Sequence, residues 1–402
     1  MFHILQCGLA DYHSHYYTET LAEIAACRDL NIDLKLYANQ AAPRPILAET
    51  GAAPLFRDVP DALFRVDPTI NHLADFIMAG ERFAADCAGL SAAGVDRGDI
   101  VFVPHARIRH LHGLARWLGT LPPDGRPIVA LRFDDPDESW IDAASPGRFT
   151  DGHAFTRFAI TELLMLVPAH RLLLFATTTV LARIVATLTR RPCARIPLAK
   201  FYPRMDEMAA MRTPSRDGRP HICVAGEFRE EKGAKLMPDI VTRFARRFPH
   251  TTLSLQVNRE SQAQAVRQIL DERGAAVELN VQIGECSRHD HYARMLAADI
   301  VLMPYLQSRY IARASGIFAE AVACGLPVVV PRLTWMAEQL ALGRAAGTSF
   351  AAFTAESVVD ALIAATETLA DLTVQARTRQ AAWHAQENVS EAIGLLMKAA
   401  SS

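Results

Sequence analysis

Two stretches in the second half of the chain combine basic side chains, glycines and helix starts in a pattern that suits an anionic ligand. In the first, a loop between a predicted strand and a predicted helix is bounded by Gly226 and Gly233, and it carries Arg229 and Lys232. Such a loop can direct two cations and free backbone N–H groups at a diphosphate. The alternative is a salt-bridged turn, because two glutamates directly precede the lysine.

The second stretch begins at Arg309 and reads as a loop, a helix, a sharp stop and a buried strand. Ser315 is a good N-cap, because its hydroxyl can accept from backbone N–H groups of the first turn. With Gly316 at that turn and Arg313 just upstream, the helix start suits phosphate. Glu320 is a carboxylate that could accept from sugar hydroxyls. The alternative is that the serine is only a cap and the charged residues are solvated.

Polar side chains in the first half follow predicted buried strands, expected from short apolar runs at residues 2–9, 99–103 and 127–131. They are His13, His15 and Tyr16 after the first strand, His105 after the second and Arg132 after the third. Ligands of open α/β sheets bind at the carboxyl ends of the strands, so these residues are candidates for substrate contacts. Loop histidines are otherwise merely solvated, and Arg132 could simply pair with the acids that follow it.

The histidines of this half do not predict a metal site. His105, His110 and His112 do not stack on one helical face, and no carboxylate completes a ligand set. The seven cysteines are scattered and never in C-x-x-C spacing, which argues against a zinc knuckle and favours reduced thiols in a cytoplasmic protein.

The length and the strand–helix alternation predict two α/β Rossmann-like domains. The chain has 402 residues, of which 50% are hydrophobic, enough for two cores. Residues 40–75 read as irregular, ending in a helix. The expected organisation is a first domain at residues 1–202, a linker at 203–219, a second domain at 220–375 and a C-terminal helical segment at 376–402 that could pack back on the first domain.

Composition also limits the partners. The formal net charge is −2, so no global field attracts nucleic acid. The chain has no apolar run long enough for a transmembrane helix and no long Lys/Arg stripe in its first half, so we expect at most peripheral membrane contact. The N-terminal residues lead directly into a strand, so we expect no signal peptide. The first loop lacks G-x-G-x-x-G, which argues against a dinucleotide cofactor.

Two motifs in the right order and separation resemble the nucleotide-sugar domain of GT-B glycosyltransferases, in particular the retaining family 4 type, over residues 196–340. They are Gly226 with Lys232-Gly233, and Pro304-Tyr305 followed by Glu320 and Gly325-Leu326-Pro327. The resemblance implies that Lys232 and Arg229 hold a donor diphosphate and that Glu320 binds the ribose. The implied donor-binding set is Gly226, Arg229, Lys232, Tyr305, Arg313, Ser315, Gly316, Ile317 and Glu320.

The resemblance further implies a retaining, metal-independent transferase that moves a sugar from a nucleotide-diphosphate donor, with UDP or GDP expected, to an unknown glycan, lipid or protein acceptor. No further cofactor is implied. His105 and Arg132 are the candidate catalytic groups at the donor sugar, and His13, His15 and Tyr16 are the acceptor-side candidates.

Three positions depart from the family pattern. Glu227 stands where the usual arginine is expected, Ala312 replaces the first glutamate of the E-x7-E motif, and Phe133 replaces a histidine. These departures support a second hypothesis, a non-catalytic sugar-nucleotide or glycan-binding paralogue. A third, a sugar-nucleotide epimerase on the same fold, has no carboxylate and histidine set that demands it.

Overall fold

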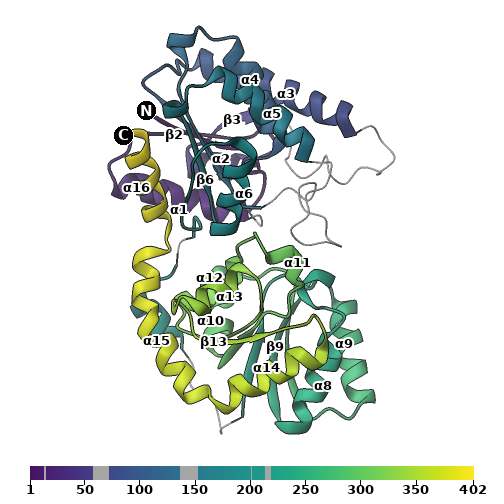
Figure 1. The fold of residues 1–402 in the computed structure, drawn as a ribbon. Helices are drawn as coiled ribbons and strands as arrows, with labels where there is room; N and C mark the ends of the chain where they lie inside the picture. The colour runs from purple at the N-terminus through teal and green to yellow at the C-terminus, as the bar shows by residue number, and fades with distance from the viewer. Residues whose placement is uncertain (13–14, 58–71, 136–152, 201, 213–218) are drawn as a thin grey trace. The chain divides into compact units, whose positions relative to one another are not determined.

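The computed structural model describes residues 1–12, 15–57, 72–135, 153–200, 202–212 and 219–402 (Figure 1). The chain forms two compact units. Unit 1 comprises residues 1–201 and 388–402, and unit 2 comprises residues 202–387. Each contains its own parallel sheet, which confirms the prediction of two α/β Rossmann-like domains.

Unit 1 is built on a seven-stranded parallel sheet of order β3-β2-β1-β4-β5-β6-β7. The chain order reverses between β1 and β4, and ligands of such sheets bind at the carboxyl ends of the strands near that point. The strands are β1 (Phe2–Gln6), β2 (Leu34–Asn39), β3 (Ala53–Phe56), β4 (Ile100–Val103), β5 (Ile128–Phe133), β6 (Leu172–Ala176) and β7 (Cys193–Arg195).

The helices of unit 1 include one from the C-terminal end of the chain. They are α1 (His15–Asp29), α2 (Arg44–Thr50), α3 (His72–Ala92), α4 (Ile108–Gly119), α5 (His153–Leu166), α6 (Thr179–Thr189) and α16 (Val389–Ala400), with short 3₁₀ turns at Pro123–Gly125 and Ala169–Arg171. Helix α16 packs beside α1 (Figure 1), and its Ile393 and Leu396 enter the apolar core of unit 1.

The prediction that residues 40–75 are irregular is wrong for α2 and β3. Helix α2 has a proline in its first turn, buries Ile46 and ends at Gly51, whose φ is +66°. Strand β3 pairs with β2 in parallel. Elements of seven and four residues show too little of a helical or strand period to be recognised in the sequence.

Unit 2 has a six-stranded parallel sheet of order β10-β9-β8-β11-β12-β13. Its chain order reverses between β8 and β11, so the loops after these two strands lie near the reversal. The strands are β8 (His221–Val224), β9 (Thr251–Val257), β10 (Val277–Ile283), β11 (Ile300–Leu302), β12 (Val328–Pro331) and β13 (Gly347–Phe350).

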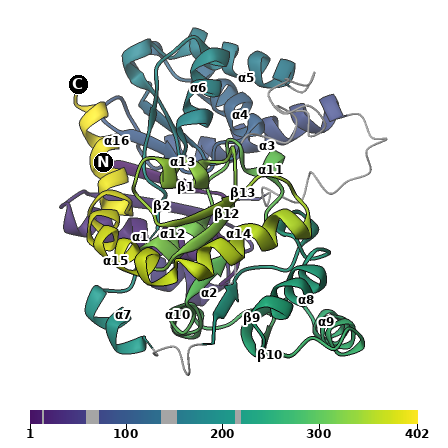
Figure 2. The same ribbon diagram turned by 60° about the horizontal axis from the view of Figure 1, so that its bottom comes forward.

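The helices of unit 2 are α7 (Met205–Met211), α8 (Met237–Arg247), α9 (Glu260–Glu272), α10 (Arg288–Leu296), α11 (Gln307–Tyr310), α12 (Gly316–Ala323), α13 (Trp335–Ala341), α14 (Ala355–Glu367) and α15 (Leu369–Gln386). Helix α14 packs on β12 and β13 (Figure 2). Helix α15 packs on α12, where Gln380 and His384 hydrogen-bond the Ala323 carbonyl at 2.7 and 2.9 Å. This contact anchors the last turn of α12, whose first turn belongs to the candidate site.

No helix among the described residues combines the length and the apolar character needed to cross a membrane.

Candidate functional site

The loop after β8 meets the start of α12 at Gly226. The φ of Gly226 is +86°, and a Cβ there would lie 3.3 Å from Lys232 Nζ and 3.3 Å from Ile317 Cγ1. The missing side chain therefore lets the lysine and the first turn of α12 approach the end of the central strand. The two predicted motifs, which are far apart in sequence, converge at this point.

Lys232 ends the 3₁₀ turn η4 (Glu230–Lys232), and its half-buried ammonium lies 5.8 Å from the ring centroid of Tyr305. Burial lowers the pKa of Lys232 to about 8, and repulsion from Arg229 and Arg313 lowers it in the same direction. A lysine with this pKa is still largely protonated at neutral pH, and an anionic ligand would stabilise the charged form.

Gly233 closes the turn with a φ of +83°, and a methyl group there would clash with the Pro304 carbonyl oxygen. We expect Gly233→Ala to destabilise unit 2 by more than the control Gly343→Ala. Gly343 has a similar φ of +69° but open space around it, so it carries only the backbone cost of about 1 kcal/mol. Urea unfolding of both variants measures the difference; equal losses would show that the loop relaxes around the methyl group.

The start of α12 has the cap that the sequence predicts. Ser315 is buried, and its hydroxyl oxygen accepts from the Phe318 N–H at 3.2 Å, ahead of Gly316 at the first helical position. Just upstream, the Arg313 guanidinium lies 5.9 Å from the ring centroid of Tyr310.

The Tyr310 ring stacks on that of Tyr305 at 4.7 Å between centroids. A stacked tyrosine pair therefore contacts Arg313 at one end and Lys232 at the other, and both cations flank the helix start.

Glu320 has a partner that the motif does not reveal. The imidazole Nε2 of His291, on α10, lies 2.9 Å from Glu320 Oε2. Burial opposes a charge on this imidazole, but hydrogen bonds to Cys286 and Glu320 outweigh it and raise the pKa of His291 to about 9. The histidine is therefore a cation at neutral pH and orients the carboxylate that the resemblance assigns to ribose binding.

A series of polar contacts links Gly226 to the surroundings of His291. Gln256 Oε1 accepts from the Gly226 N–H at 3.0 Å and from Arg294 Nη2 at 3.2 Å. Arg294 also lies 3.8 Å from Cys286 Sγ, next to His291. Sequence reasoning missed Gln256, Cys286, His291 and Arg294, because no local pattern marks them. The last three belong to α10 and the loop just before it, and only folding brings this segment to Gln256 on β9 and Glu320 on α12.

Cys286 directly precedes the N-cap of α10 and is partly exposed. The hydrogen bond from His291, together with nearby Arg294, lowers the pKa of the Cys286 thiol although burial opposes this. We therefore expect iodoacetamide near neutral pH to alkylate Cys286 before any other cysteine, since the thiolate is the reactive form. Cys193 is the internal control: it is also partly exposed, but burial raises its pKa to about 12. Peptide mass spectrometry after brief labelling checks this, and equal labelling of both thiols would contradict it.

Unit 1 contains a second group of charged side chains at the carboxyl edge of β4 and β5. His105 lies between two carboxylates, with Nδ1 at 2.5 Å from Asp134 Oδ2 and Nε2 at 3.0 Å from Glu19 Oε2. Arg132 donates to the same two acids, at 3.0 Å to Glu19 and 2.9 Å to Asp134, and lies 3.6 Å from Glu23. The structure thus joins His105 and Arg132, which the sequence only suggested separately. It confirms that Arg132 pairs with one of the acids that follow it, Asp134, and adds Glu19 and Glu23.

The inner members of this group are removed from solvent, whereas the side chains of His105 and Asp134 are 11% and 21% exposed. The exposed fraction of Arg132 is 2%, and Glu23 is fully buried. Burial disfavours the charged imidazole, but Glu19 and Asp134 outweigh it and raise the pKa of His105 to about 9. Burial raises the pKa of Glu23 to about 7, against the attraction of Arg132. The group is therefore a compact set of ion pairs, each member of which depends on the others.

Of the remaining predicted residues, some lie beside His105 and others do not. His15 and Tyr16 lie beside His105, with ring centroids 5.4 and 4.7 Å from it, whereas His13 is outside the described residues. Arg229 is half-exposed and forms an ion pair with Glu227, the residue that departs from the family pattern.

Four further residues are bonded or buried within their own unit: two histidines of α4, and two of the residues that depart from the family pattern. His110 Nδ1 accepts from the Arg107 N–H at 3.1 Å, while His112 Nδ1 lies 2.8 Å from Glu162. Neither shares the partners of His105. Phe133 and Ala312 are both buried, so each fills apolar space where the family pattern has a polar side chain.

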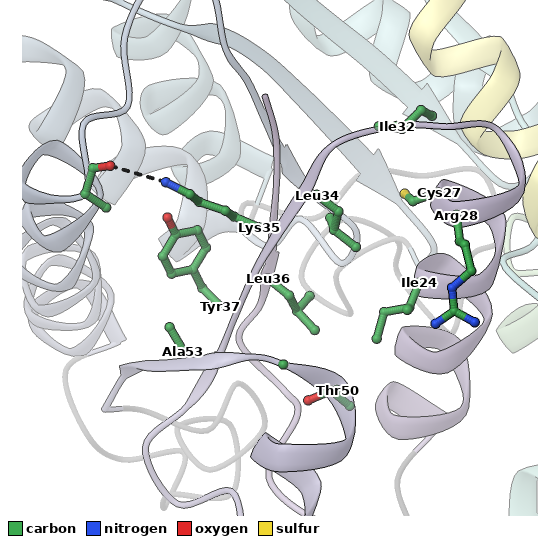
Figure 3. Close-up of a pocket in the computed structure, with 12 residues that line it drawn as sticks. Ile24, Cys27, Arg28, Ile32, Leu34, Lys35, Leu36, Tyr37, Thr50 and Ala53 are labelled. Atoms are coloured by element: carbon green, nitrogen blue, oxygen red, sulfur yellow. Dashed lines mark hydrogen bonds between the residues drawn. The ribbon is translucent and has the colours of Figure 1, made fainter.

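A cavity of about 630 Å³ lies in unit 1 beside α1 and β2, lined by Ile24, Cys27, Leu34, Leu36, Tyr37 and others (Figure 3). Lys35 reaches across it to the Ala93 carbonyl oxygen at 3.5 Å. None of the predicted site residues lines this cavity, and its lining brings no group of convergent titratable side chains together. We therefore do not assign the functional site to this cavity, despite its size.

No protein-family model matches the chain, and no curated protein matches it in sequence. Solved structures do match it over nearly their whole length. A glycosyltransferase from Rickettsia africae ESF-5 has a TM-score of 0.69 at 10% identity, covering 99% of this chain and 97% of its own. HepE from Anabaena in complex with UDP has a TM-score of 0.64 at 13% identity, covering 100% and 99%.

A UDP-GlcNAc 2-epimerase from Neisseria meningitidis, bound to UDP-GlcNAc, is also similar, with a TM-score of 0.54 at 12% identity and 99% coverage of both chains. Enzymes with different reactions share this architecture, so function has to be argued from the site. The described units and the full-length matches together show that this chain has the GT-B fold of those glycosyltransferase structures.

Proposed function

We propose that this protein is a glycosyltransferase of the retaining family 4 type, which moves a sugar from a nucleotide-diphosphate donor to an acceptor without a metal ion at the diphosphate. One observation carries the proposal: the Lys232 ammonium and the first turn of α12 converge on the side-chain-free end of β8 at Gly226. The similarity of the fold to glycosyltransferase structures, some of them solved with UDP, supports it.

The chemistry requires that charge on the leaving diphosphate be neutralised as the bond from its oxygen to the anomeric carbon breaks. Lys232 and Arg313 would supply cations, and the N–H groups at Ser315, Gly316 and Ile317 would supply hydrogen-bond donors and the positive end of a helix dipole.

Glu320, oriented by His291, would accept from the ribose hydroxyls. A carboxylate that binds ribose favours a nucleotide, rather than a simple phosphate, as the ligand of these residues. UDP and GDP are the expected donors.

His105 and Arg132 remain the candidate groups at the donor sugar, and His15 and Tyr16 those on the acceptor side. Because carboxylates engage both ring nitrogens of His105, we assign it an electrostatic role rather than proton transfer. The seven free cysteines fit the reducing environment of the cytoplasm.

Calorimetry with UDP-, GDP-, ADP- and TDP-sugars, followed by turnover assays on the donor that binds, tests the proposal. We expect saturable binding of one nucleotide class, turnover that persists in EDTA, and a product whose anomeric configuration by NMR matches the donor. An inverted product would refute the retaining assignment, and the absence of binding to all four classes would refute nucleotide-sugar use.

The second candidate is a sugar-nucleotide-binding paralogue without turnover. The buried Ala312, in place of a carboxylate, and the pairing of Glu227 with Arg229 favour it. Binding of a donor with neither transfer nor hydrolysis, over a panel of glycan, lipid and protein acceptors, would select this candidate.

A further inference from the structure

His15, Glu19 and His105 have the arrangement of a set of metal ligands. One ligating atom from each lies within 4.8 Å of the others. His15 and Glu19 are one helical turn apart at the start of α1, so their side chains share a helix face. His105 follows β4, which neighbours β1 in the sheet, and this pairing brings the two loops together.

The surroundings of His105 match those of a metal-binding histidine. Such a histidine usually donates its other ring N–H to a carboxylate, which fixes the tautomer and the ring orientation. Here His105 Nδ1 lies 2.5 Å from Asp134 Oδ2, which leaves Nε2 directed at Glu19 Oε2. Arg132 holds Asp134 from the other side through its Nε at 2.9 Å.

From this geometry we propose that His15, Glu19 and His105 bind a divalent transition-metal ion of the zinc class in unit 1, with Asp134 orienting His105. Two imidazole nitrogens and one carboxylate oxygen suit zinc or cobalt rather than magnesium or calcium. Three protein ligands leave a fourth position for water or a ligand, and of the three only His15 is exposed.

The charges of the group are compatible with such an ion. The acids Glu19, Glu23 and Asp134 face the guanidinium of Arg132 and the imidazole of His105. A dication that replaces the imidazole proton makes the group neutral when the three acids are ionised. Arg132 competes with the ion at two of the three ligands, because its Nη2 is 3.0 Å from the same Glu19 oxygen and 3.5 Å from His105 Nε2. Binding therefore requires the guanidinium to withdraw from both and to keep its contacts with Asp134 and Glu23.

This site shares His15 and His105 with the candidate groups at the sugar and the acceptor, but none of the residues proposed for the diphosphate, and the proposal does not depend on the protein being a transferase. Protein stripped with a chelator is titrated with Zn²⁺ against a competing chromophoric chelator, and with Co²⁺ while its visible absorption is recorded. We expect one equivalent to bind and Co²⁺ to give the absorption of a four-coordinate nitrogen and oxygen site.

His15→Ala should weaken Zn²⁺ binding at least tenfold with the fold intact by circular dichroism, because His15 is exposed. Asp134→Asn should weaken it about 10- to 100-fold, as for other carboxylates behind a ligating histidine. His170→Ala is the matched control, since His170 is an exposed histidine of unit 1 outside the cluster, and should bind Zn²⁺ like the original protein.

The absence of a saturable equivalent, or equal affinity in His15→Ala and His170→Ala, overturns the proposal. UDP and GDP binding to the metal-stripped protein is measured in parallel. Zinc binding without nucleotide binding would refute only the proposed function, and the reverse would refute only the metal site.

Discussion

Lys232→Ala is expected to lower glycosyl transfer by about 10²- to 10³-fold and to weaken binding of the free nucleoside diphosphate, while unit 2 stays folded. The lysine directs its charge at the end of β8, where Gly226 leaves room. Loss of one preorganised group that stabilises developing charge typically costs this much. Calorimetry with UDP and GDP, and turnover with the donor that binds, measure the effect.

Lys235→Ala is the matched control for this prediction. Lys235 lies only three positions away, and its ammonium is exposed and 2.6 Å from Glu230 Oε1. Its removal should change binding and turnover less than about twofold, because exposed ion pairs contribute little. If the two variants behave alike, Lys232 does not contact the diphosphate.

The pH dependence of nucleotide binding provides an independent check on Lys232. Because the pKa of this lysine in the free protein is lowered to about 8, its charge is present below that pH and is lost as the pH rises through it. Affinity for the diphosphate should therefore decline above about pH 8 in the original protein. Lys232→Ala should lack this decline, and a decline of the same size in the variant would assign the titration to another group.

Arg132→Leu is expected to destabilise unit 1 by about 3–5 kcal/mol, the usual result of removing one partner from a buried ion pair. The guanidinium contacts Glu19, Glu23 and Asp134, and without it these acids lose the cation that all three share. Urea unfolding measures the loss. Hydrogen exchange of the β4 and β5 amides localises it to unit 1.

Arg116→Ala is the control for the buried network. Arg116 is an exposed arginine of the same unit, 2.9 Å from Glu81, and its loss should cost about 0–1 kcal/mol. A loss of this small size for Arg132→Leu would mean that water enters and solvates the acids.

The network lowers the pKa of Asp134, so the stability that this carboxylate contributes is present above its unfolded pKa of about 4 and is lost as the pH falls below that value. The difference between the original protein and Arg132→Leu should therefore shrink in acid.

Local features of the site follow from the sequence. Gly325, at the predicted helix end, has a φ of +64°, and Gly226 and Gly233, which bound the predicted loop, have φ values of +86° and +83°. Ser315 caps α12 as predicted. Continuous apolar runs likewise predicted β4, β5, β8 and β12, because a parallel strand covered on both faces must be apolar throughout.

The sequence did not reveal α2 and β3, which are short and depend on pairing with β2 for their place. It also did not reveal that Arg132 meets two acids of α1 in addition to Asp134. Glu19 and Glu23 are spaced like ordinary polar residues of α1, and nothing in their own segment indicates that folding buries them.

By itself, the sequence determined the two parallel α/β units, the glycine-bounded basic loop and the capped helix start, because each depends on backbone preferences and periodicity within a few residues. Only the tertiary structure decided the partners of the charged side chains. Arg132 meets Glu19 across 113 positions, and His291 meets Glu320 across 29. These pairings depend on which strands lie side by side and which helix faces turn inward. Such a choice is made by burial of the whole core, so no single segment encodes it.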